Sequence, residues 1–359
     1  LARQGPRAFY EGSLAEAIAA DMQRHGGLIT RGDLAGYKAL EKKPLVARYR
    51  SYDILTVPPS SAGGVSLIEM LNMLEPHDLR SLGHNSSAYV HLVSEVMKRA
   101  YADRSRWLAD PDFVSIPVPA LLSREYAASR MAGFDPQRAT PVETLGPGDP
   151  LALEKPSTTH FSIIDEAGNI VSNTYTLNER FGNGAVVEGL GFLLNDEMDD
   201  FSVKPGQPNL FGLIGGEANS IAPGKRMASS MTPTLVLERA ESSPATASAP
   251  ARPVLVLGSP GGAVIISAVL EVLLDIVDFR MELQTAVDAP RFHHQWRPDR
   301  IFLDKDGFPS DVIEALRRRG HDVVERAPRA EVQAIFVDRE TGWLRGASDA
   351  RGFGLSSGY

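Results

Sequence analysis

The sequence predicts a layered sandwich of the α/β or α+β class, with sheets inside and helices outside. Three observations indicate this class. Helical periodicity dominates residues 1–140, strand-like alternation dominates from Thr158 onward, and two segments have the order strand, glycine-rich turn, helix. A four-residue hairpin loop in the second half favours antiparallel sheets, whereas the strand–glycine–helix segments are compatible with either strand arrangement.

The first predicted element is a helix over residues 13–25. Ser13 and Glu16 have the spacing of a capping box, in which each side chain bonds the backbone of the other. Apolar side chains recur every four residues, and Gly26 follows the last turn, where its backbone freedom suits a helix end.

The next predicted elements form a strand, a turn and two helices. Alternating apolar residues over 52–57 predict a strand, and the Pro/Ser/Gly-rich residues 58–64 predict a turn. Helical spacing of apolar residues then predicts a helix over 67–74 and a longer one over 87–107, which ends before Pro111.

A change of composition separates the two halves of the chain. Residues 141–157 contain four prolines and two glycines without apolar periodicity, which predicts a surface linker. Strand-like alternation follows over 159–165 and 170–177. The intervening residues 166–169 predict a tight turn, so the two strands should form a β-hairpin.

The rest of the chain mixes strands and helices. A Ser/Ala/Pro-rich insertion at 239–252 is predicted to be a disordered extension of a hairpin. The remaining predicted elements are strands at 231–238 and 253–257, an apolar helix to about residue 279, a helix at 310–319, and strands at 332–337 and 343–346.

Composition excludes several classes of protein. The 359 residues include 37 basic and 45 acidic ones, a net charge of −8 without a long basic run, so a nucleic-acid partner is not expected. Cysteine is absent, which excludes disulfides, thiolate zinc sites and a cysteine nucleophile. We expect neither a signal peptide nor a membrane span, because the N-terminus has no apolar core and no apolar run reaches 18 residues.

The first candidate for chemistry is Thr158, which stands with Ser157 where the predicted linker meets the first predicted strand. If the Ser157–Thr158 bond were cleaved, Thr158 would carry both a hydroxyl nucleophile and an α-amine as its general base. The alternative is that two threonines simply begin a strand, since threonine is a good strand former.

Three further segments could bind a substrate. The glycine turn that contains Gly261 and Gly262 precedes an apolar helix and could present N–H groups to an oxyanion, or be only a tight turn. Residues 195–200 could hold an ammonium group, with a calcium site less favoured and a solvated loop as the alternative. Ser229 and Ser230 could bind a carboxylate, or be ordinary turn serines.

Histidines do not indicate a metal site. His293 and His294 are adjacent, so their side chains point in different directions, and no third ligand is evident from the sequence. We therefore expect both to be structural and no metal to be bound.

In this order the segments resemble the γ-glutamyltransferase (γ-glutamyltranspeptidase) family of N-terminal nucleophile hydrolases. The resemblance covers nearly the whole chain and is most specific at Thr158-Thr159-His160-Phe161-Ser162 and Ser229-Ser230-Met231-Thr232-Pro233-Thr234. Similar motifs lie at 9–12, 27–30, 58–64, 100–104, 174–178, 198–201, 258–262, 289–295 and 346–349.

The resemblance implies a four-layer αββα sandwich with antiparallel central sheets. It also implies a precursor that cuts itself before the nucleophile, giving the C-terminal part of a large subunit, residues 1–157, and a small subunit, residues 158–359. The implied reaction is transfer of a γ-glutamyl group from glutathione or a related donor to Thr158, and from there to water, an amino acid or a dipeptide.

The resemblance also implies roles for individual residues. Thr158 would be the nucleophile and Thr176 would orient it, while Gly261 and Gly262 would form the oxyanion hole. Asn178, Glu197 and Asp200 would bind the substrate α-amino group, and Ser229 and Ser230 its α-carboxylate. Residues 203–219 would form a lid over the substrate, with Phe211 where some relatives have tyrosine.

Other expectations follow from the same resemblance. No cofactor is expected, and a bacterial member would be periplasmic or secreted. Residue 1 would fall inside the large subunit, downstream of the arginine with which the family binds the substrate carboxylate. Two alternatives remain, namely a related amidase or acylase for a β-lactam side chain or polyglutamate, and a non-catalytic fragment.

Overall fold

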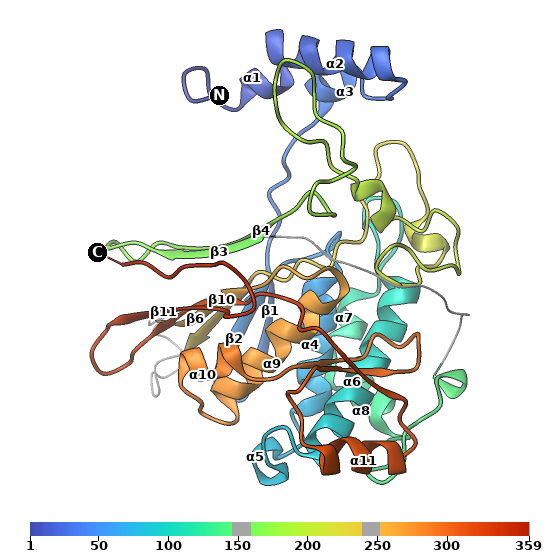
Figure 1. Cartoon of the computed structure of the whole chain (residues 1–359), viewed down its shortest axis with the longest axis vertical. Helices are drawn as coiled ribbons and strands as arrows, with labels where there is room; N and C mark the ends of the chain where they lie inside the picture. The colour runs from blue at the N-terminus through green and yellow to red at the C-terminus, as the bar shows by residue number, and fades with distance from the viewer. Residues whose placement is uncertain (146–158, 239–251, 359) are drawn as a thin grey trace. The chain divides into compact units, whose positions relative to one another are not determined.

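The computed structural model describes residues 1–145, 159–238 and 252–358 (Figure 1). The chain forms two compact units. The smaller unit comprises Leu1–Lys43 and Leu177–Glu197, and the larger comprises Pro44–Thr176 and Met198–Tyr359. These units do not follow the predicted subunit boundary at residue 157, because segments from both sides of that boundary belong to the larger unit. The boundary concerns chain cleavage and stays a prediction.

An antiparallel six-stranded sheet forms the centre of the larger unit. Its strand order is β1-β2-β5-β6-β10-β11, and every neighbouring pair runs antiparallel. The strands are β1 (Leu45–Tyr49), β2 (Tyr52–Thr56), β5 (Thr234–Glu238), β6 (Arg252–Gly258), β10 (Gln333–Val337) and β11 (Leu344–Ser348).

A two-stranded sheet packs on one face of the central sheet. Strands β3 (Thr159–Ile164) and β4 (Ile170–Tyr175) form the predicted hairpin and contact β6 and β10. Figure 1 shows this hairpin on one side of the central sheet and helices on the other. The predicted α+β class with antiparallel central sheets is confirmed. On the outer face of the hairpin, Phe161, Ile163 and Tyr175 are exposed.

Helices cover the second face of the central sheet. The predicted helices are confirmed as α4 (Gly63–Leu74), α6 (Ser87–Trp107), α9 (Ile265–Val277) and α11 (Ser310–Arg318). Every residue of α4 is buried, because this helix packs against both α6 and α9. Through the described ranges, no helix combines the length and the apolar character that a membrane span requires.

Shorter elements complete the larger unit. A three-stranded sheet contains one parallel pair, β8 with β9, beside the antiparallel pair β7 and β8. Its strands are β7 (Phe292–His293), β8 (Ile301–Asp304) and β9 (Val323–Arg326), and the short helices are α5 (Leu79–Leu82), α7 (Val118–Leu121), α8 (Arg124–Met131) and α10 (Leu283–Asp288).

The smaller unit has its own apolar core. It contains α1 (Arg7–Tyr10), α2 (Ser13–His25) and α3 (Arg31–Gly36), together with the loop of residues 177–197. The buried core residues are Ala15, Ile18, Leu34 and Val187.

Helix α2 has the predicted bounds, Ser13–His25, but not the predicted cap. Gly12 is its N-cap and no side chain caps it, so the capping box expected at Ser13 and Glu16 is wrong. Ser13 is already the first helical residue, which leaves its hydroxyl one position too late to cap. The capping box of this unit lies instead between Thr30 and Asp33, at the start of α3.

The predicted linker and insertion lie mostly outside the described residues. Residues 146–158 and 239–251 are not described, so the expectations for them stay predictions. At its start the linker prediction is wrong, because Val142–Thr144 forms a 3₁₀ turn and Val142 is buried. Arg252 already belongs to β6.

Replacing Gly64 with alanine should destabilise the larger unit strongly. A Cβ at this position would overlap the carbonyl oxygen of Val57 and lie 2.9 Å from Cγ2 of Thr56, at the close approach of β2 to α4. The backbone would have to move, so we expect a loss of roughly 3 kcal/mol or more. A urea unfolding curve would measure it.

Gly36→Ala is the matched control for this substitution. Gly36 lies in α3, and no atom lies within 4 Å of the position that an added methyl group would occupy, so alanine should change stability by no more than about 1 kcal/mol. Equal effects of the two substitutions would contradict the close-approach explanation.

Candidate functional site

At one end of the central sheet, strands β2 and β6 finish and strands β5 and β10 start. Thr56 at the end of β2 pairs with Thr234 at the start of β5, and Thr234 pairs with Leu257 near the end of β6. Gly258 in turn pairs with Gln333 at the start of β10. The antiparallel register therefore brings three predicted segments, residues 58–64, 229–233 and 259–262, to the same end of the sheet.

The β3–β4 hairpin reaches this end as well. Thr159, the first residue of β3, pairs with Tyr175, the last residue of β4. The imidazole of His160 packs so closely on Gly258 that a Cβ there would overlap the ring. Ser172 of β4 donates to the carbonyl oxygen of Leu257 at 3.1 Å. Thr159 thus lies beside the last residues of β6.

Of the predicted threonines, only Thr176 can be placed. It directly follows β4, next to the residue that pairs with Thr159. Ser157 and Thr158 lie outside the described residues, and Thr158 is one peptide bond from Thr159. Among the described residues, Thr159 is therefore the nearest in sequence to the predicted nucleophile.

The predicted glycine turn has the geometry of an anion site. Gly261 has φ 138° and Gly262 has φ 55°, and a 3₁₀ turn, Gly262–Val264, leads into α9. Within the described residues the N–H groups of both glycines donate to no acceptor. Two unpaired N–H groups at the start of a helix can stabilise a developing oxyanion. The hydroxyl of Tyr101 anchors the turn by donating to Ala263 O at 2.5 Å.

Ser229 and Ser230 are both buried, and both hydroxyl oxygens act as acceptors. Met231 N donates to Ser229 Oγ at 3.2 Å, and Arg104 Nη2 donates to Ser230 Oγ at 3.1 Å. A hydroxyl that accepts one hydrogen bond still carries its own proton. Because no described residue accepts these protons, two O–H donors stand ready for an anion such as a carboxylate.

The serine segment is held in place by its neighbours. Ser61 Oγ donates to Met231 O at 2.7 Å, and Ala62 N donates to Ser229 O at 2.8 Å. Thr232 Oγ1 donates to Ser230 O at 2.9 Å. The glycine-rich turn after β2 therefore fixes the position of the serine pair.

Asp200 is tied to the same segment through one asparagine. Asn219 Nδ2 donates to Asp200 O at 2.8 Å, and Asn219 Oδ1 accepts from Ala228 N at 3.0 Å. Asn219 thus joins the short 3₁₀ helix Glu197–Asp200 to the residues just before Ser229. Within the larger unit, this links Asp200, one of the predicted ammonium-binding residues, to the predicted carboxylate-binding segment.

Asn178 and Glu197 belong to the smaller unit. Asn178 is buried with φ 72°, and its Nδ2 donates to Asp196 O at 3.3 Å. Glu197 N donates to Asn195 Oδ1 at 3.0 Å. These bonds fix the two residues within the smaller unit, and their predicted role in substrate binding stays a prediction.

The predicted lid is anchored at Phe211. The Phe211 side chain is only 4% exposed and belongs to the main apolar core. Its carbonyl oxygen accepts from Gln295 Nε2 at 3.1 Å, and Pro208 forms an isolated bridge with Ile214. In this structure Phe211 serves as an anchor of the loop, and its role over a substrate stays a prediction.

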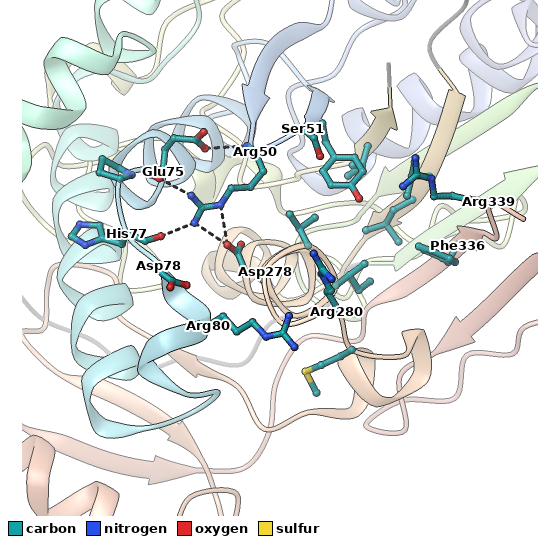
Figure 2. A pocket seen from close by; sticks show the side chains of 18 residues that line it. Arg50, Ser51, Glu75, His77, Asp78, Arg80, Asp278, Arg280, Phe336 and Arg339 are labelled. Atoms are coloured by element: carbon teal, nitrogen blue, oxygen red, sulfur yellow. Dashed lines mark hydrogen bonds and ion pairs between the residues drawn. The ribbon is translucent and has the colours of Figure 1, made fainter. Parts of the chain in front are cut away.

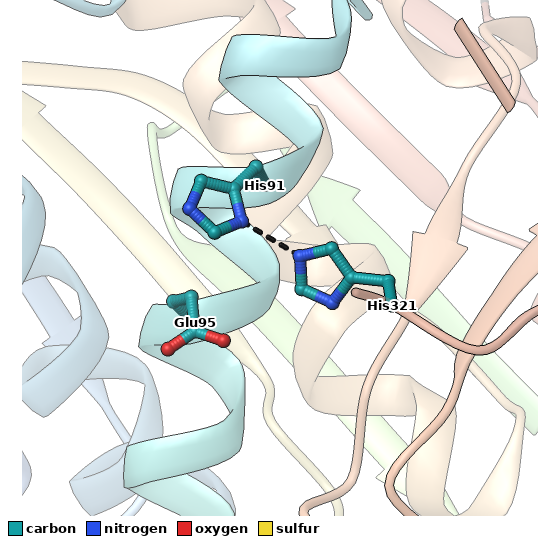
Figure 3. A group of neighbouring side chains, drawn as sticks. All are labelled: His91, Glu95 and His321. Carbon is teal, nitrogen blue, oxygen red and sulfur yellow. Dashed lines mark hydrogen bonds between the residues drawn. The ribbon is translucent and has the colours of Figure 1, made fainter. Parts of the chain in front are cut away.

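A buried cluster of His91, Glu95 and His321 has ligand atoms close enough for a metal ion (Figure 3). However, His91 Nδ1 and His321 Nε2 already share a hydrogen bond of 2.6 Å. Glu95 is paired with Lys98 at 3.0 Å and with Arg99 at 2.7 Å. A divalent cation would face two cations beside its only carboxylate ligand, so we assign no metal to this cluster.

His293 and His294 are bonded inside the protein. His293 Nδ1 lies 2.8 Å from Ser267 Oγ and its Nε2 lies 3.0 Å from Gln295 Oε1. His294 Nε2 lies 3.1 Å from Asp299 Oδ1. Burial lowers the pKa of both imidazoles, which suits neutral rings in a structural network.

A pocket lies near the opposite end of the central sheet, where β2 begins at Tyr52 (Figure 2). Arg50 stands inside it, but its guanidinium is already bonded. It donates to Asp278 Oδ1 at 2.9 Å, Glu75 O at 2.6 Å and His77 O at 2.7 Å. With its central cation already neutralised, this pocket does not resemble a substrate-carboxylate site.

Sequence reasoning missed two residues that organise the site, Arg104 and Asn219. A signal for Arg104 exists, because it continues the buried helical stripe of Tyr89, Val96 and Ala100 in α6. A charged residue on a core-facing stripe indicates a buried polar contact. Asn219 has no comparable signal, since it lies in a loop without periodicity.

His160 should make stability depend on pH. Burial lowers the pKa of His160 from 6.5 to about 4, so the folded state holds this ring neutral where the unfolded chain would protonate it. The unfolded state therefore binds more protons between pH 6.5 and about 4, and stability should fall as pH falls through this window. The total loss should be roughly 3 kcal/mol for this residue.

Urea unfolding at pH 7 and pH 4.5 would measure this effect. His160→Gln keeps a hydrogen-bonding side chain opposite Thr174 but cannot titrate, so its stability should fall less on acidification. An equal pH dependence in both proteins would show that His160 does not cause it. Comparison with the variant is needed because burial also lowers the pKa of His321, to about 3.

The comparisons with known proteins fit this fold and site. The model of the γ-glutamyltranspeptidase family matches residues 1–359. The chain therefore belongs to this family of N-terminal nucleophile hydrolases, whose members include glutathione hydrolases.

Three relatives illustrate the similarity. The glutathione hydrolase proenzyme of Escherichia coli K12 is 43% identical over 360 residues, covering 100% of this chain and 60% of that protein. A cephalosporin acylase from Bacillus halodurans has a TM-score of 0.80 at 28% identity, over 96% of this chain and 58% of that one. A γ-glutamyltranspeptidase variant from Pseudomonas nitroreducens has a TM-score of 0.50 at 45% identity, over 56% of this chain and 99% of that one. The chain thus spans about 60% of the length of the E. coli relative.

Proposed function

We propose that the chain is the catalytic part of a γ-glutamyl hydrolase or transferase whose nucleophile is Thr158. The substrate class is a γ-glutamyl amide such as glutathione, and the acceptor is water, an amino acid or a dipeptide. One observation carries the proposal. The start of β3, the unpaired N–H groups of Gly261 and Gly262, and the serine pair Ser229–Ser230 all belong to one end of the stacked sheets.

The first proposed step is cleavage of the Ser157–Thr158 bond. The Thr158 hydroxyl attacks the Ser157 carbonyl carbon, the C–N bond breaks as the proton passes to nitrogen, and water hydrolyses the resulting ester. The products are a carboxylate on Ser157 and a free α-amine on Thr158. This amine then serves as the general base for the same hydroxyl.

The second proposed step is acyl transfer. The Thr158 hydroxyl attacks the γ-carbonyl carbon of the donor, and its proton passes through the α-amine to the leaving amine. The N–H groups of Gly261 and Gly262 stabilise the oxyanion of the tetrahedral intermediate. Water or an acceptor amine then attacks the γ-glutamyl ester and restores the hydroxyl. None of these steps uses a metal or an organic cofactor.

The donor's charged groups are matched by the serine pair and by Asp200. The hydroxyl protons of Ser229 and Ser230 suit a carboxylate, and the Asp200 carboxylate suits an ammonium group. The role of Thr176 in orienting the nucleophile, and those of Asn178 and Glu197 in binding the ammonium group, remain proposals drawn from the family resemblance.

Intact mass after incubation at neutral pH tests the first step. Cleavage before Thr158 would divide the 359 residues into fragments of 157 and 202 residues (359 − 157 = 202). Release of the chromophore from a γ-glutamyl anilide, with competition by free glutamate, tests the second. An uncut chain that releases no chromophore would contradict the proposal.

A second candidate is an acylase for another amide, and the TM-score of 0.80 with the cephalosporin acylase favours it. The two candidates differ in what they recognise beside the amide. A γ-glutamyl enzyme requires the α-amino and α-carboxylate groups of glutamate, whereas an acylase of that kind would act on an acyl group without them. Turnover of a glutaryl anilide, unaffected by glutamate, would support the acylase.

A further inference from the structure

Arg104 is a buried cation that forms no salt bridge with any residue that the structure describes. It lies in the last turn of α6 and is only 7% exposed. Across residues 1–145, 159–238 and 252–358, no carboxylate lies within ion-pair distance of its guanidinium. Buried charges in proteins are normally paired, because removing a charge from water is costly. Within the described residues, the charge of Arg104 is therefore not neutralised by a direct ion pair.

The guanidinium faces the serine segment. Its Nη2 donates to Ala228 O and to Ser230 Oγ, both at 3.1 Å. Its Nε is buried and donates to nothing within the described residues. Burial lowers the pKa of Arg104, which nearby Tyr101 and Asp200 partly offset, but an arginine remains protonated at neutral pH.

The bond to Ser230 fixes the direction of that hydroxyl. Because Arg104 can only donate, Ser230 Oγ must accept, and the Ser230 proton must point elsewhere. An acceptor opposite this proton would be hydrogen-bonded to Ser230 and attracted by the positive charge behind it. A carboxylate would satisfy both conditions and would bring a negative charge closer to the Arg104 guanidinium.

We propose that Arg104 is a positioning residue for the substrate α-carboxylate, which it orients and attracts through Ser230. This inference rests on the proposed γ-glutamyl activity and extends it. Arg104 does not touch the reacting amide. Its effect should therefore appear in substrate binding, and only for substrates that carry an α-carboxylate.

The test compares two anilide substrates in Arg104→Gln. One is γ-glutamyl p-nitroanilide, and the other is its 4-aminobutanoyl analogue, which keeps the amino group but lacks the α-carboxylate. For the γ-glutamyl substrate, KM should rise roughly tenfold or more with a smaller change in kcat. For the analogue, KM should stay within about twofold. A merely structural role of Arg104 would change both substrates alike.

Two variants keep the test sharp. Arg104→Lys retains the positive charge and should recover part of the preference for the carboxylate-bearing substrate. Ser230→Ala should reduce this preference as well, and the double variant Arg104→Gln/Ser230→Ala should lose less than the two single losses combined, because Arg104 acts through Ser230. Independent, additive losses would overturn the inference.

Arg106→Gln is the matched control. Arg106 is exposed near the end of the same helix, where its guanidinium lies 4.8 Å from the ring centroid of Trp107. Arg106→Gln should change the KM of both substrates equally and only slightly. Thermal unfolding of each variant identifies any that is poorly folded, in which case Arg104→Lys provides the comparison.

Failure of the inference can be distinguished from failure of the proposed function. If the unaltered protein neither cleaves the γ-glutamyl substrate nor binds glutamate in calorimetry, the proposed function fails and the inference fails with it. If the unaltered protein cleaves the γ-glutamyl substrate or binds glutamate, the proposed function stands. If Arg104→Gln then leaves the preference for the carboxylate unchanged, only the role of Arg104 is overturned.

Discussion

Thr158→Ala is expected to leave the protein as one uncut chain and to reduce γ-glutamyl anilide turnover at least about a thousandfold. The methyl group of alanine cannot attack the Ser157 carbonyl, so no α-amine is released and no γ-glutamyl ester can form. Thr158→Ser keeps a hydroxyl and should still be cleaved, more slowly. Intact mass and chromophore release measure the two effects on the same sample.

Thr159→Ala is the control for this prediction. Thr159 is exposed at the start of β3, so its loss removes a neighbouring hydroxyl without removing the predicted nucleophile. We expect cleavage at the same bond and activity close to that of the unaltered protein. Cleavage before residue 158 in Thr158→Ala would show that another group cuts the chain.

Gly261→Ala should produce the second large effect, a fall in kcat of roughly 10²–10³-fold. Gly261 has φ 138°, which a residue with a side chain rarely adopts. A Cβ would lie 2.9 Å from Val264 Cγ2 and 3.0 Å from Ala330 Cβ. The turn must shift to relieve these contacts, and its N–H groups then no longer point at the oxyanion. Steady-state kinetics on the γ-glutamyl anilide would measure the loss.

Gly168→Ala separates this effect from the general cost of alanine at positive φ. Gly168 lies in the turn between β3 and β4 with φ 79°, and no atom lies within 4 Å of the position of a Cβ. This substitution should cost about 1 kcal/mol of stability and leave kcat unchanged. If Gly168→Ala reduced kcat as much as Gly261→Ala, the oxyanion-hole explanation would be wrong.

Local sequence signals predicted the longer helices of the larger unit, but not the short helices α5, α7, α8 and α10. Helix α6 has the predicted bounds because a serine caps its start and a buried stripe repeats at helical spacing for five turns. The β3–β4 hairpin was predicted for a similar reason, since apolar and polar residues alternate along its strands and its turn contains Gly168. These signals involve residues close together in the sequence.

Pairing between distant segments could not be predicted from local signals. Strand β1 was missed, and nothing in residues 45–56 indicates that β2 pairs with β5, more than 170 residues later. The order of the central sheet depends on these pairings. The sequence therefore predicted most of the strands, but not which of their ends lie together at one end of the sheet.

The candidate site divides in the same way. Hydroxyls, carboxylates and glycines show their chemistry through residue type, so Ser229, Ser230, Gly261 and Gly262 could be selected from the sequence. Arg104 acquires its role only when α6 packs against the segment before β5. Its partner there, Ser230, is 126 positions later in the sequence. Its contribution depends on tertiary packing and required the structure.

The central sheet has a consequence for the two halves of the chain. Strand β2, from the part before residue 157, pairs over five residues with β5, from the part after it, and α4 packs against α9 (Figure 1). After a cut at residue 157, neither piece would possess a complete core. Produced separately, residues 1–157 and 158–359 should each aggregate or stay unfolded and should regain structure when mixed, so that the stability of the cut protein depends on dilution.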